Sequence, residues 1–217
     1  MLTEMIKKLL EVPENVWDIY ALRGEPLKNK IPEEELPVYL ELAHRTGKEL
    51  AARVRAEYPG QSPEQICEAL KLRLNRIEEK DGGPYTMFAC YTEPDRIDLY
   101  MGSIESLEKL LKEEKQAALP GEVPVQDILL AHELFHYYEC HEPEFPTRRK
   151  LITLWKIGKF RYKSPLTVLS EIAAMEFAKD LLGLSWHPYL LDILLLYASD
   201  HQEGRKLYDC LLKLQEN

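Results

Sequence analysis

The spacing of apolar and polar positions predicts helices over most of the first eighty residues. Residues 1–17 show a short amphipathic pattern in which charged side chains interrupt the apolar positions. A longer helical pattern covers residues 36–58 and stops before a Pro-Gly pair. Ser62 begins a third pattern as an N-cap, Gln65 closes a capping box, and the glycines at 82–83 end it. We therefore expect a helical region over residues 1–83.

The period then changes from helical to alternating. Residues 84–92 and 95–103 are rich in β-branched and aromatic side chains, and the Glu-Pro-Asp between them is typical of a turn. This pattern predicts a β-hairpin whose second strand buries one face. We expect residues 96–101 to form a sheet edge on which an extended peptide could lie.

Helical patterns return and fill the rest of the chain. Ser103 is expected to cap a helix that ends at residues 120–121, and Ser164 and Pro165 are expected to start another as N-cap and first residue. The other helices are predicted at 124–140, 188–199 and 201–215. The fold class is therefore α+β, mostly helical with one small sheet. We expect residues 84–217 to form the main domain, continuous with the N-terminal helices.

Composition and charge exclude several classes of protein. The chain has 217 residues and a net charge of −9, which argues against direct nucleic-acid binding because phosphate affinity comes from clustered Lys and Arg. No apolar run approaches the ~20 residues that cross a bilayer, and the start is no signal peptide. We expect no membrane partner and a cytoplasmic location. The four cysteines are widely spaced and are expected to be free thiols: Cys67, Cys90, Cys140 and Cys210.

The predicted helix at 124–140 carries His132-Glu133-Leu134-Phe135-His136. Residues four apart share a helix face, so His132 and His136 can bind one ion. Glu133 is turned by about 100° from them and can reach a water on that ion. The helix is apolar on nearly every side and is therefore expected to be buried, so its histidines need partners. Zn²⁺ would supply them; the alternative is that both histidines hydrogen-bond to core carbonyls.

A third ligand is expected on the predicted helix at 164–183. At 100° per residue, Glu171 falls within the apolar stripe of this helix. An unpaired carboxylate in such a buried position would destabilise the fold. Glu176 falls with charged residues on the polar side. We therefore predict His132, His136 and Glu171 as metal ligands and Glu176 as a solvated residue. His44 is expected to be structural or solvated, and His187 is expected to be a packed loop residue.

One pattern of residues carries a resemblance: His132-Glu133-x-x-His136, followed by Glu171-x-x-Ala174-x-x-Phe177-Ala178. It resembles the gluzincin clan of zinc peptidases and is most similar to the ImmA/IrrE family. The resemblance covers about 95–182. It implies a zincin-like fold with a sheet edge beside the motif helix, and limited proteolysis of a regulatory protein, often a transcriptional repressor. It also implies Glu133 as general base beside a three-ligand zinc ion. The chain departs from the family at Phe135 and in the 34 residues between His136 and Glu171.

Three functions remain open at this point: a zinc peptidase acting on one or a few proteins, a zincin-fold regulatory or binding protein that retains metal with little hydrolysis, and a structural or empty site. Residues 148–163 hold seven basic residues and no acidic one. They form either a cleft wall that attracts an acidic or nucleic-acid-bound partner, or a solvated strand or helix face. A donor for the oxyanion is also undecided among six residues: Tyr137, Tyr138, His141, Tyr197, His201 and Tyr208.

Overall fold

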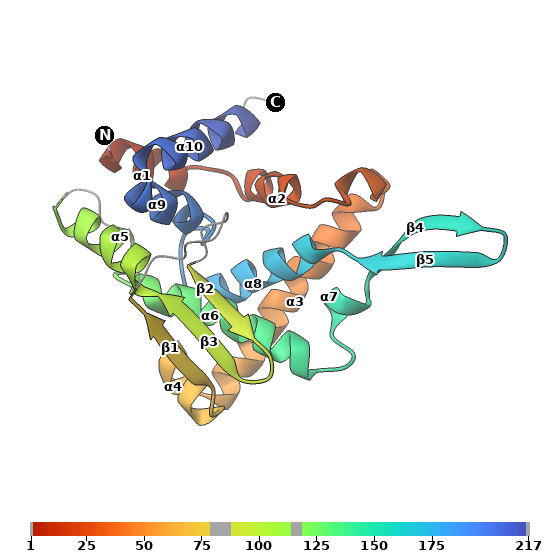
Figure 1. Cartoon of the computed structure of the whole chain (residues 1–217), viewed down its shortest axis with the longest axis horizontal. Coiled ribbons are helices and arrows are strands. Elements are labelled where there is room, and N and C mark those ends of the chain that lie inside the picture. The colour runs from red at the N-terminus through yellow and green to blue at the C-terminus, as the bar shows by residue number, and fades with distance from the viewer. Residues whose placement is uncertain (1, 79–87, 114–118, 216–217) are drawn as a thin grey trace.

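The structure is a computed structural model that describes residues 2–78, 88–113 and 119–215. Helices dominate it, and two small sheets of three and two strands accompany them, which confirms the α+β class (Figure 1). No helix in these ranges is long and apolar enough to cross a membrane. The four cysteines are free, as expected.

The N-terminal helices largely follow the prediction. They are α1 (Leu2–Leu10), α2 (Glu14–Arg23), the 3-10 turn η1 (Lys28–Lys30), α3 (Leu36–Glu57) and α4 (Pro63–Ala69). The capping box of α4 is present: the Gln65 amide donates to Ser62 Oγ at 3.3 Å, and the Ser62 amide donates to Gln65 Oε1 at 2.9 Å.

The predicted extent of α4 is wrong. The helix ends at Ala69, Lys71 takes a positive φ of 61°, and Arg73–Ile77 forms strand β1. Leu72 and Leu74 alternate with polar residues there, which suits a strand, and pairing with a neighbouring strand satisfies the backbone. The glycines at 82–83 lie outside the described residues.

The three-stranded sheet contains β1, β2 (Ala89–Thr92) and β3 (Arg96–Tyr100) in the order β1-β3-β2. β2 and β3 form the expected antiparallel hairpin, although residues 84–87 of its first arm lie outside the described ranges. β1 pairs with β3 in parallel. The expectation that residues 96–101 form an edge is therefore wrong: β3 is central, and β1 and β2 are the two edges.

The remaining helices are α5 (Met101–Glu113), α6 (Val125–His141), α7 (Pro146–Arg149), α8 (Thr167–Leu182), α9 (Leu190–Ser199) and α10 (His201–Gln215). Two predicted caps are wrong. Ser103 is buried inside α5 and accepts a hydrogen bond from Ser199 Oγ at 3.2 Å. Ser164 and Pro165 end a strand, and α8 begins at Thr167.

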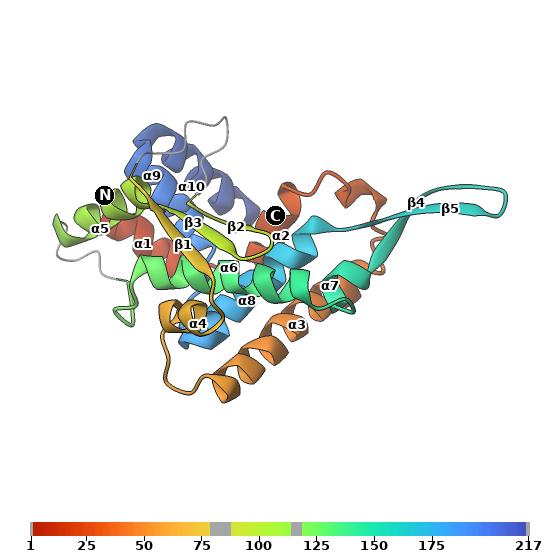
Figure 2. The ribbon, with the colours of Figure 1, turned by 60° about the horizontal axis from the view of Figure 1, so that its bottom comes forward.

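Residues 151–165 form a two-stranded antiparallel ribbon, β4 (Leu151–Ile157) and β5 (Phe160–Pro165). The ribbon extends away from the helical body (Figure 2). Its outer part is exposed, which agrees with a solvated strand. The cleft-wall interpretation is not supported, because none of the residues lining the site cavities described below comes from the ribbon.

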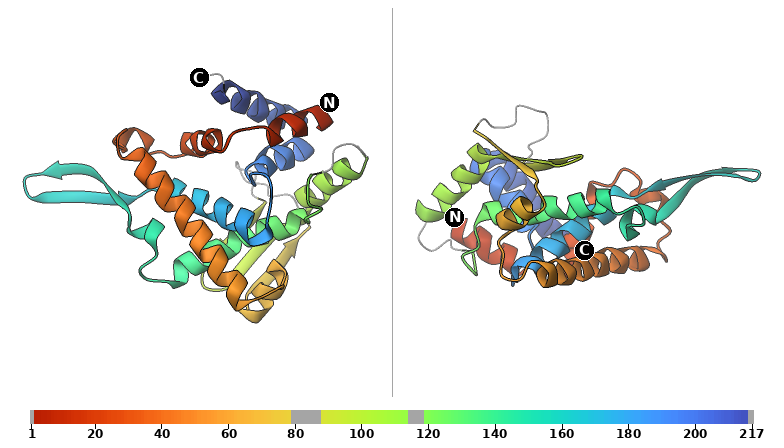
Figure 3. Two further views of the ribbon diagram at one scale, coloured as in Figure 1. Left: turned by 180° about the vertical axis from the view of Figure 1, so that it is seen from behind. Right: turned by 90° about the horizontal axis from the view of Figure 1, so that it is seen from below.

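Close packing of α3 on α8 joins the N-terminal helices to the motif helices. The two run side by side (Figure 3), and α8 packs in turn on α6. Gly47 permits the approach, since a Cβ at this position would lie 2.4 Å from the Ala173 carbonyl oxygen. Any larger residue would push α3 off the helix that carries Glu171.

Candidate metal centre

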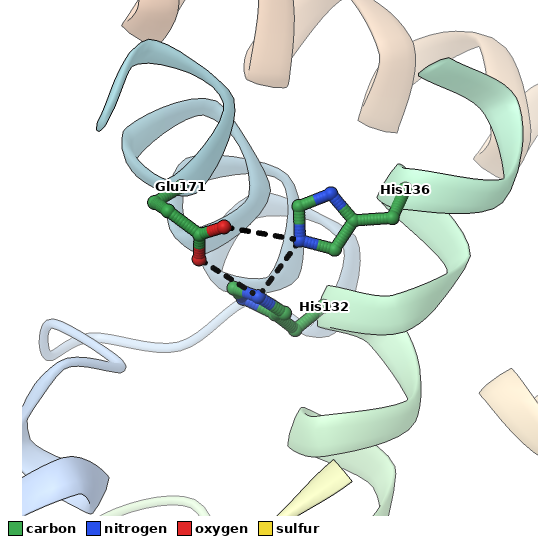
Figure 4. A group of neighbouring side chains, drawn as sticks. All are labelled: His132, His136 and Glu171. Atoms are coloured by element: carbon green, nitrogen blue, oxygen red, sulfur yellow. Dashed lines mark hydrogen bonds and ion pairs between the residues drawn. The ribbon is translucent and has the colours of Figure 1, made fainter. Parts of the chain in front are cut away.

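Helices α6 and α8 bring His132, His136 and Glu171 together (Figure 4). The Nε2 atoms of the two histidines are 3.0 Å apart. Glu171 Oε2 lies 3.4 Å from His132 Nε2, and its Oε1 lies 3.7 Å from His136 Nε2. Within the described ranges this is the one cluster of His, Cys, Asp and Glu found with a geometry able to hold a metal ion. The three residues predicted as ligands therefore meet at one point.

The spacing of these donor atoms fits a small divalent cation. Zinc binds imidazole nitrogen and carboxylate oxygen at about 2.0–2.2 Å in tetrahedral geometry, so its ligand atoms stand about 3.4 Å from one another. The observed separations of 3.0, 3.4 and 3.7 Å bracket that value. Two nitrogens and one oxygen also match the donor set of an open, catalytic zinc site. The site could instead hold its charges as an ion pair between histidine and glutamate.

His136 is oriented by a buried carboxylate on the side away from the cluster. Its Nδ1 lies 3.3 Å from Ser170 Oγ and 3.5 Å from Glu139 Oε2. Ser170 donates to that same carboxylate at 2.5 Å, and Thr147 donates to its other oxygen. Burial raises the pKa of Glu139, but the hydrogen bonds from His136, Ser170 and Thr147 outweigh it and leave the pKa lowered. An ionised Glu139 keeps the proton of His136 on Nδ1 and leaves Nε2 free to bind.

His132 is the most buried of the three candidate ligands. Burial lowers its pKa, yet the hydrogen bond and charge of Glu171 raise the pKa to about 9. Partial desolvation at the cleft wall raises the pKa of Glu171, and the same interactions with His132 bring it down to about 2. The pair is thus held as imidazolium and carboxylate, and a cation that binds here displaces a proton.

Glu133 is positioned by the edge of the sheet. Its side chain is buried, and the backbone amide of Tyr91 in β2 donates to its Oε2 at 2.6 Å. Glu133 lines the same cleft as His132 and Glu171. As the helix geometry predicts, it is absent from the three-ligand cluster yet lies close to it.

Two adjoining cavities open beside the cluster. One, of about 670 Å³, contains His132, Glu133 and Glu171 among mostly apolar neighbours: Phe88, Ala89, Ile128, Leu129, Met175, Pro188, Leu191, Leu196 and Leu207. The other, of about 540 Å³, lies on the far side of Glu171. Tyr189 and Asp192 line both. A substrate of several residues could reach the cluster through this cleft.

The predicted burial of the two α8 glutamates is wrong in both cases. The Glu171 side chain is 48% exposed, because its helix face borders the cleft. Glu176 is 3% exposed and accepts from His44 Nδ1 at 2.8 Å, while Lys48 Nζ lies 3.3 Å away. Glu176 lies on the polar stripe of α8, and α3 packs against that stripe. His44 and Lys48 of α3 supply the neighbouring positive charges.

Sequence reasoning missed Asp192 and Tyr189. Burial raises the pKa of Asp192 to about 7. The Tyr189 hydroxyl is buried and has no hydrogen-bond partner among the described residues. The six residues considered as oxyanion donors line neither cavity, whereas Tyr189 lines both. Asp192 lies in a strongly apolar helix, and this pattern could have identified it as a candidate from sequence.

His187 is a packed residue as expected, stacked between Trp17 and Tyr189.

Comparison of the chain with protein-family models, with curated proteins and with solved structures finds no match.

Proposed function

We propose that the protein is a zinc-dependent peptidase that hydrolyses peptide bonds of one or a few protein substrates. The observation that carries the proposal is the convergence of His132, His136 and Glu171 at one point beside the buried carboxylate of Glu133. The resemblance to gluzincins, and to the ImmA/IrrE family in particular, supports the same activity. A cytoplasmic location and a regulatory protein as substrate belong to this proposal.

His132, His136 and Glu171 would hold the ion. When bound, zinc supplies a Lewis acid that polarises a carbonyl oxygen and lowers the pKa of water. Glu133 acts as general base, taking a proton from the attacking water and passing it to the leaving amine. The Tyr91 amide holds the Glu133 carboxylate at the cleft wall. We assign Tyr189 as the donor that stabilises developing negative charge, because it lines both cavities and its hydroxyl has no hydrogen-bond partner among the described residues.

Metal analysis and paired variants test this function. We expect the purified protein to contain one zinc per chain and His132→Ala or Glu171→Ala to lose it. Glu133→Gln should keep the zinc and lose hydrolysis of a peptide library by a factor of at least a hundred, since a general base contributes about 10²–10⁴-fold. His141→Ala is the matched control, because His141 is exposed on the same helix and bonds only to a backbone carbonyl. A zinc-free wild type, or full hydrolysis by Glu133→Gln, would overturn the proposal.

One observation favours a second function, a regulatory or binding protein that retains metal. The Tyr91 amide already engages one oxygen of Glu133, so that oxygen takes part in a structural hydrogen bond in addition to any catalytic role. If wild type holds zinc but cleaves no peptide, and Glu133→Gln gives the same cellular phenotype, this second function is the correct one.

A further inference from the structure

The β4–β5 ribbon leaves the body between α7 and α8 and ends far from it (Figures 1 and 2). Its inner end is anchored: Ile152 is buried, and Lys150 Nζ lies 4.5 Å from the centre of the Tyr39 ring. Its outer end, residues 155–163, is exposed throughout. An isolated two-stranded ribbon is marginally stable in water, so such an arm is expected to contact something outside the chain.

Apolar and cationic side chains occupy opposite faces of this outer end. Trp155 pairs with Tyr162 and Ile157 with Phe160, and alternation along β5 places both pairs on one face. These four side chains are 50%, 54%, 70% and 79% exposed, in that order. The pair Lys156 and Arg161 lies on the other face together with Lys163, and Lys159 stands in the turn.

The side chains also follow an order along the arm. Ile157 and Phe160 flank the turn at the tip, the Lys156–Arg161 pair comes next, and Trp155 stacked on Tyr162 follows. At about 3.3 Å per residue, the stacked rings stand about 7 Å behind the tip pair. Lys159 stands in the turn ahead of the apolar pair, and its long side chain can reach back toward the headgroups. The apolar pair, with the other cations and the Trp–Tyr pair behind it, then matches the sequence of environments from acyl chains to headgroups.

The cations of the outer arm form no ion pair with any residue that the structure describes. Residues 148–163 hold seven basic residues in a chain of net charge −9, so the rest of the chain carries −16. At the base, Arg149 pairs with Glu144. Among the described residues, no acidic side chain forms an ion pair with any of four cations: Lys156, Lys159, Arg161 and Lys163. An anionic partner is therefore expected, and the length of the arm keeps the acidic body away from it.

Two other partners fit less well. Single-stranded nucleic acid needs open ring faces beside cations on one surface, whereas Trp155 and Tyr162 stack on each other at 5.7 Å and the cations lie on the opposite face. A second copy would bring cationic arms together. On the body, the described residues expose only Ile19 and Val38 as further large apolar side chains for such a copy to cover.

We propose that the β4–β5 ribbon is a membrane-surface arm that inserts its tip into an anionic lipid bilayer. Ile157 and Phe160 enter the acyl boundary, Trp155 and Tyr162 lie at headgroup level, and the four cations contact lipid phosphates. No helix among the described residues is long and apolar enough to cross a membrane, and this proposal concerns contact with the membrane surface alone. It departs from the sequence-based expectation of no membrane partner. The inference does not depend on zinc or on hydrolysis.

Binding of the full chain to lipid vesicles tests the arm. We expect sedimentation with phosphatidylcholine vesicles that contain phosphatidylserine, weaker binding as salt rises, and at least tenfold weaker binding to phosphatidylcholine alone. Trp155 is half-exposed whereas Trp17 and Trp186 are buried, so a blue shift of tryptophan emission on binding reports the arm itself.

Variants separate the arm from non-specific adsorption. The double variant Ile157→Ser, Phe160→Ser should bind at least tenfold more weakly, and each of Lys156→Gln and Arg161→Gln about fivefold more weakly. Ile19→Ser, Val38→Ser is the control with exposed apolar residues on the body, and it should bind like wild type. All these positions are exposed, and unchanged circular dichroism confirms that each variant folds.

Three results would overturn the proposal: no preference for anionic vesicles, equal binding by the tip variant, or binding without any change in Trp155 emission. Salt-sensitive binding to an oligonucleotide that the tip variant loses, in the absence of vesicle binding, would assign the arm to nucleic acid instead. Concentration-dependent association in sedimentation equilibrium that the tip variant abolishes, again without vesicle binding, would assign it to a second copy.

Discussion

At the scale of single residues, the candidate centre depends on side chains that do not belong to the ligand set. Glu139 lies three residues after His136 on the same helix and is buried with hydrogen bonds from Ser170 and Thr147. A histidine ligand bonded in this way keeps one tautomer and one ring orientation. Glu139 is therefore a positioning residue, and its effect should appear in metal affinity before it appears in folding.

Replacing Glu139 by Gln should weaken zinc binding about 10–100-fold, because the amide supports the Nδ1 proton of His136 less strongly than a carboxylate. Competition with a chelating dye measures the affinity. Glu142→Gln is the matched control: it also neutralises a glutamate near the end of α6, but one that pairs with Arg53 at the surface. Equal zinc affinity in the two variants would show that Glu139 serves packing alone.

The convergence of the three candidate ligands was predictable from sequence, and their surroundings were not. The spacing of His132 and His136 determines a shared helix face whatever packs on it. The burial of Glu171 and Glu176 depends on which neighbours α8 meets. An apolar stripe can line a cleft as well as a core, and a polar stripe can be covered when a partner helix brings cations such as His44 and Lys48. A helical wheel carries no information about that partner.

At the scale of elements, the contact between α3 and α8 holds the ligand helix in place. Gly47 lies where a Cβ would stand 2.4 Å from the Ala173 carbonyl oxygen and 2.9 Å from the Phe177 amide nitrogen. Both are backbone atoms of a buried helix and cannot turn aside as a side chain would. The helices can reach this separation only with glycine at the crossing.

Gly47→Ala should therefore destabilise the protein by about 1–3 kcal/mol, even though alanine favours a helix by about 1 kcal/mol over glycine. Urea unfolding measures the change. Gly24→Ala is the control, since its added Cβ would meet nothing closer than 3.6 Å and its φ is −77°. Equal stability of Gly47→Ala and Gly24→Ala would show that α3 can move away from α8 without loss of stability. The tight crossing would then not stabilise the fold.

Predicted elements were wrong where long-range pairing overrode local signals. Residues 73–77 follow a well-formed capping box yet become β1, because β3 offers a complete set of backbone partners. Ser164 and Pro165 resemble a helix start, but β4 pairs with both. Local cap chemistry predicts that a helix can begin at a residue; only the tertiary partner decides whether it does.

At the scale of the whole molecule, a polar network joins the N-terminal helices to the centre. His44 of α3 donates from Nδ1 to Glu176 of α8 at 2.8 Å and from Nε2 to Asp18 of α2 at 3.0 Å. Both ring nitrogens donate, so the imidazole must carry its proton. Glu176 lies about one and a half turns beyond Glu171 on the same helix, which ties the position of this candidate ligand to the N-terminal helices.

This network makes stability depend on pH in a defined direction. Hydrogen bonds to Asp18 and Glu176 raise the pKa of His44 from 6.5 to about 9, although burial lowers it. A pKa that is higher in the folded state adds stability that is complete below pH 6.5 and is lost as the pH rises through 9. The loss should reach about 3 kcal/mol at most, the value of the shift at 1.36 kcal/mol per unit.

Urea unfolding of wild type and His44→Gln from pH 6 to about 9.5, at matched metal content, measures this loss of stability. The exposed His141→Gln is the control. The stability difference between wild type and His44→Gln should shrink steadily across that range, while His141→Gln should run parallel to wild type. A constant difference at every pH would mean that His44 is neutral in the folded protein and joins the three helices by packing, not by charge.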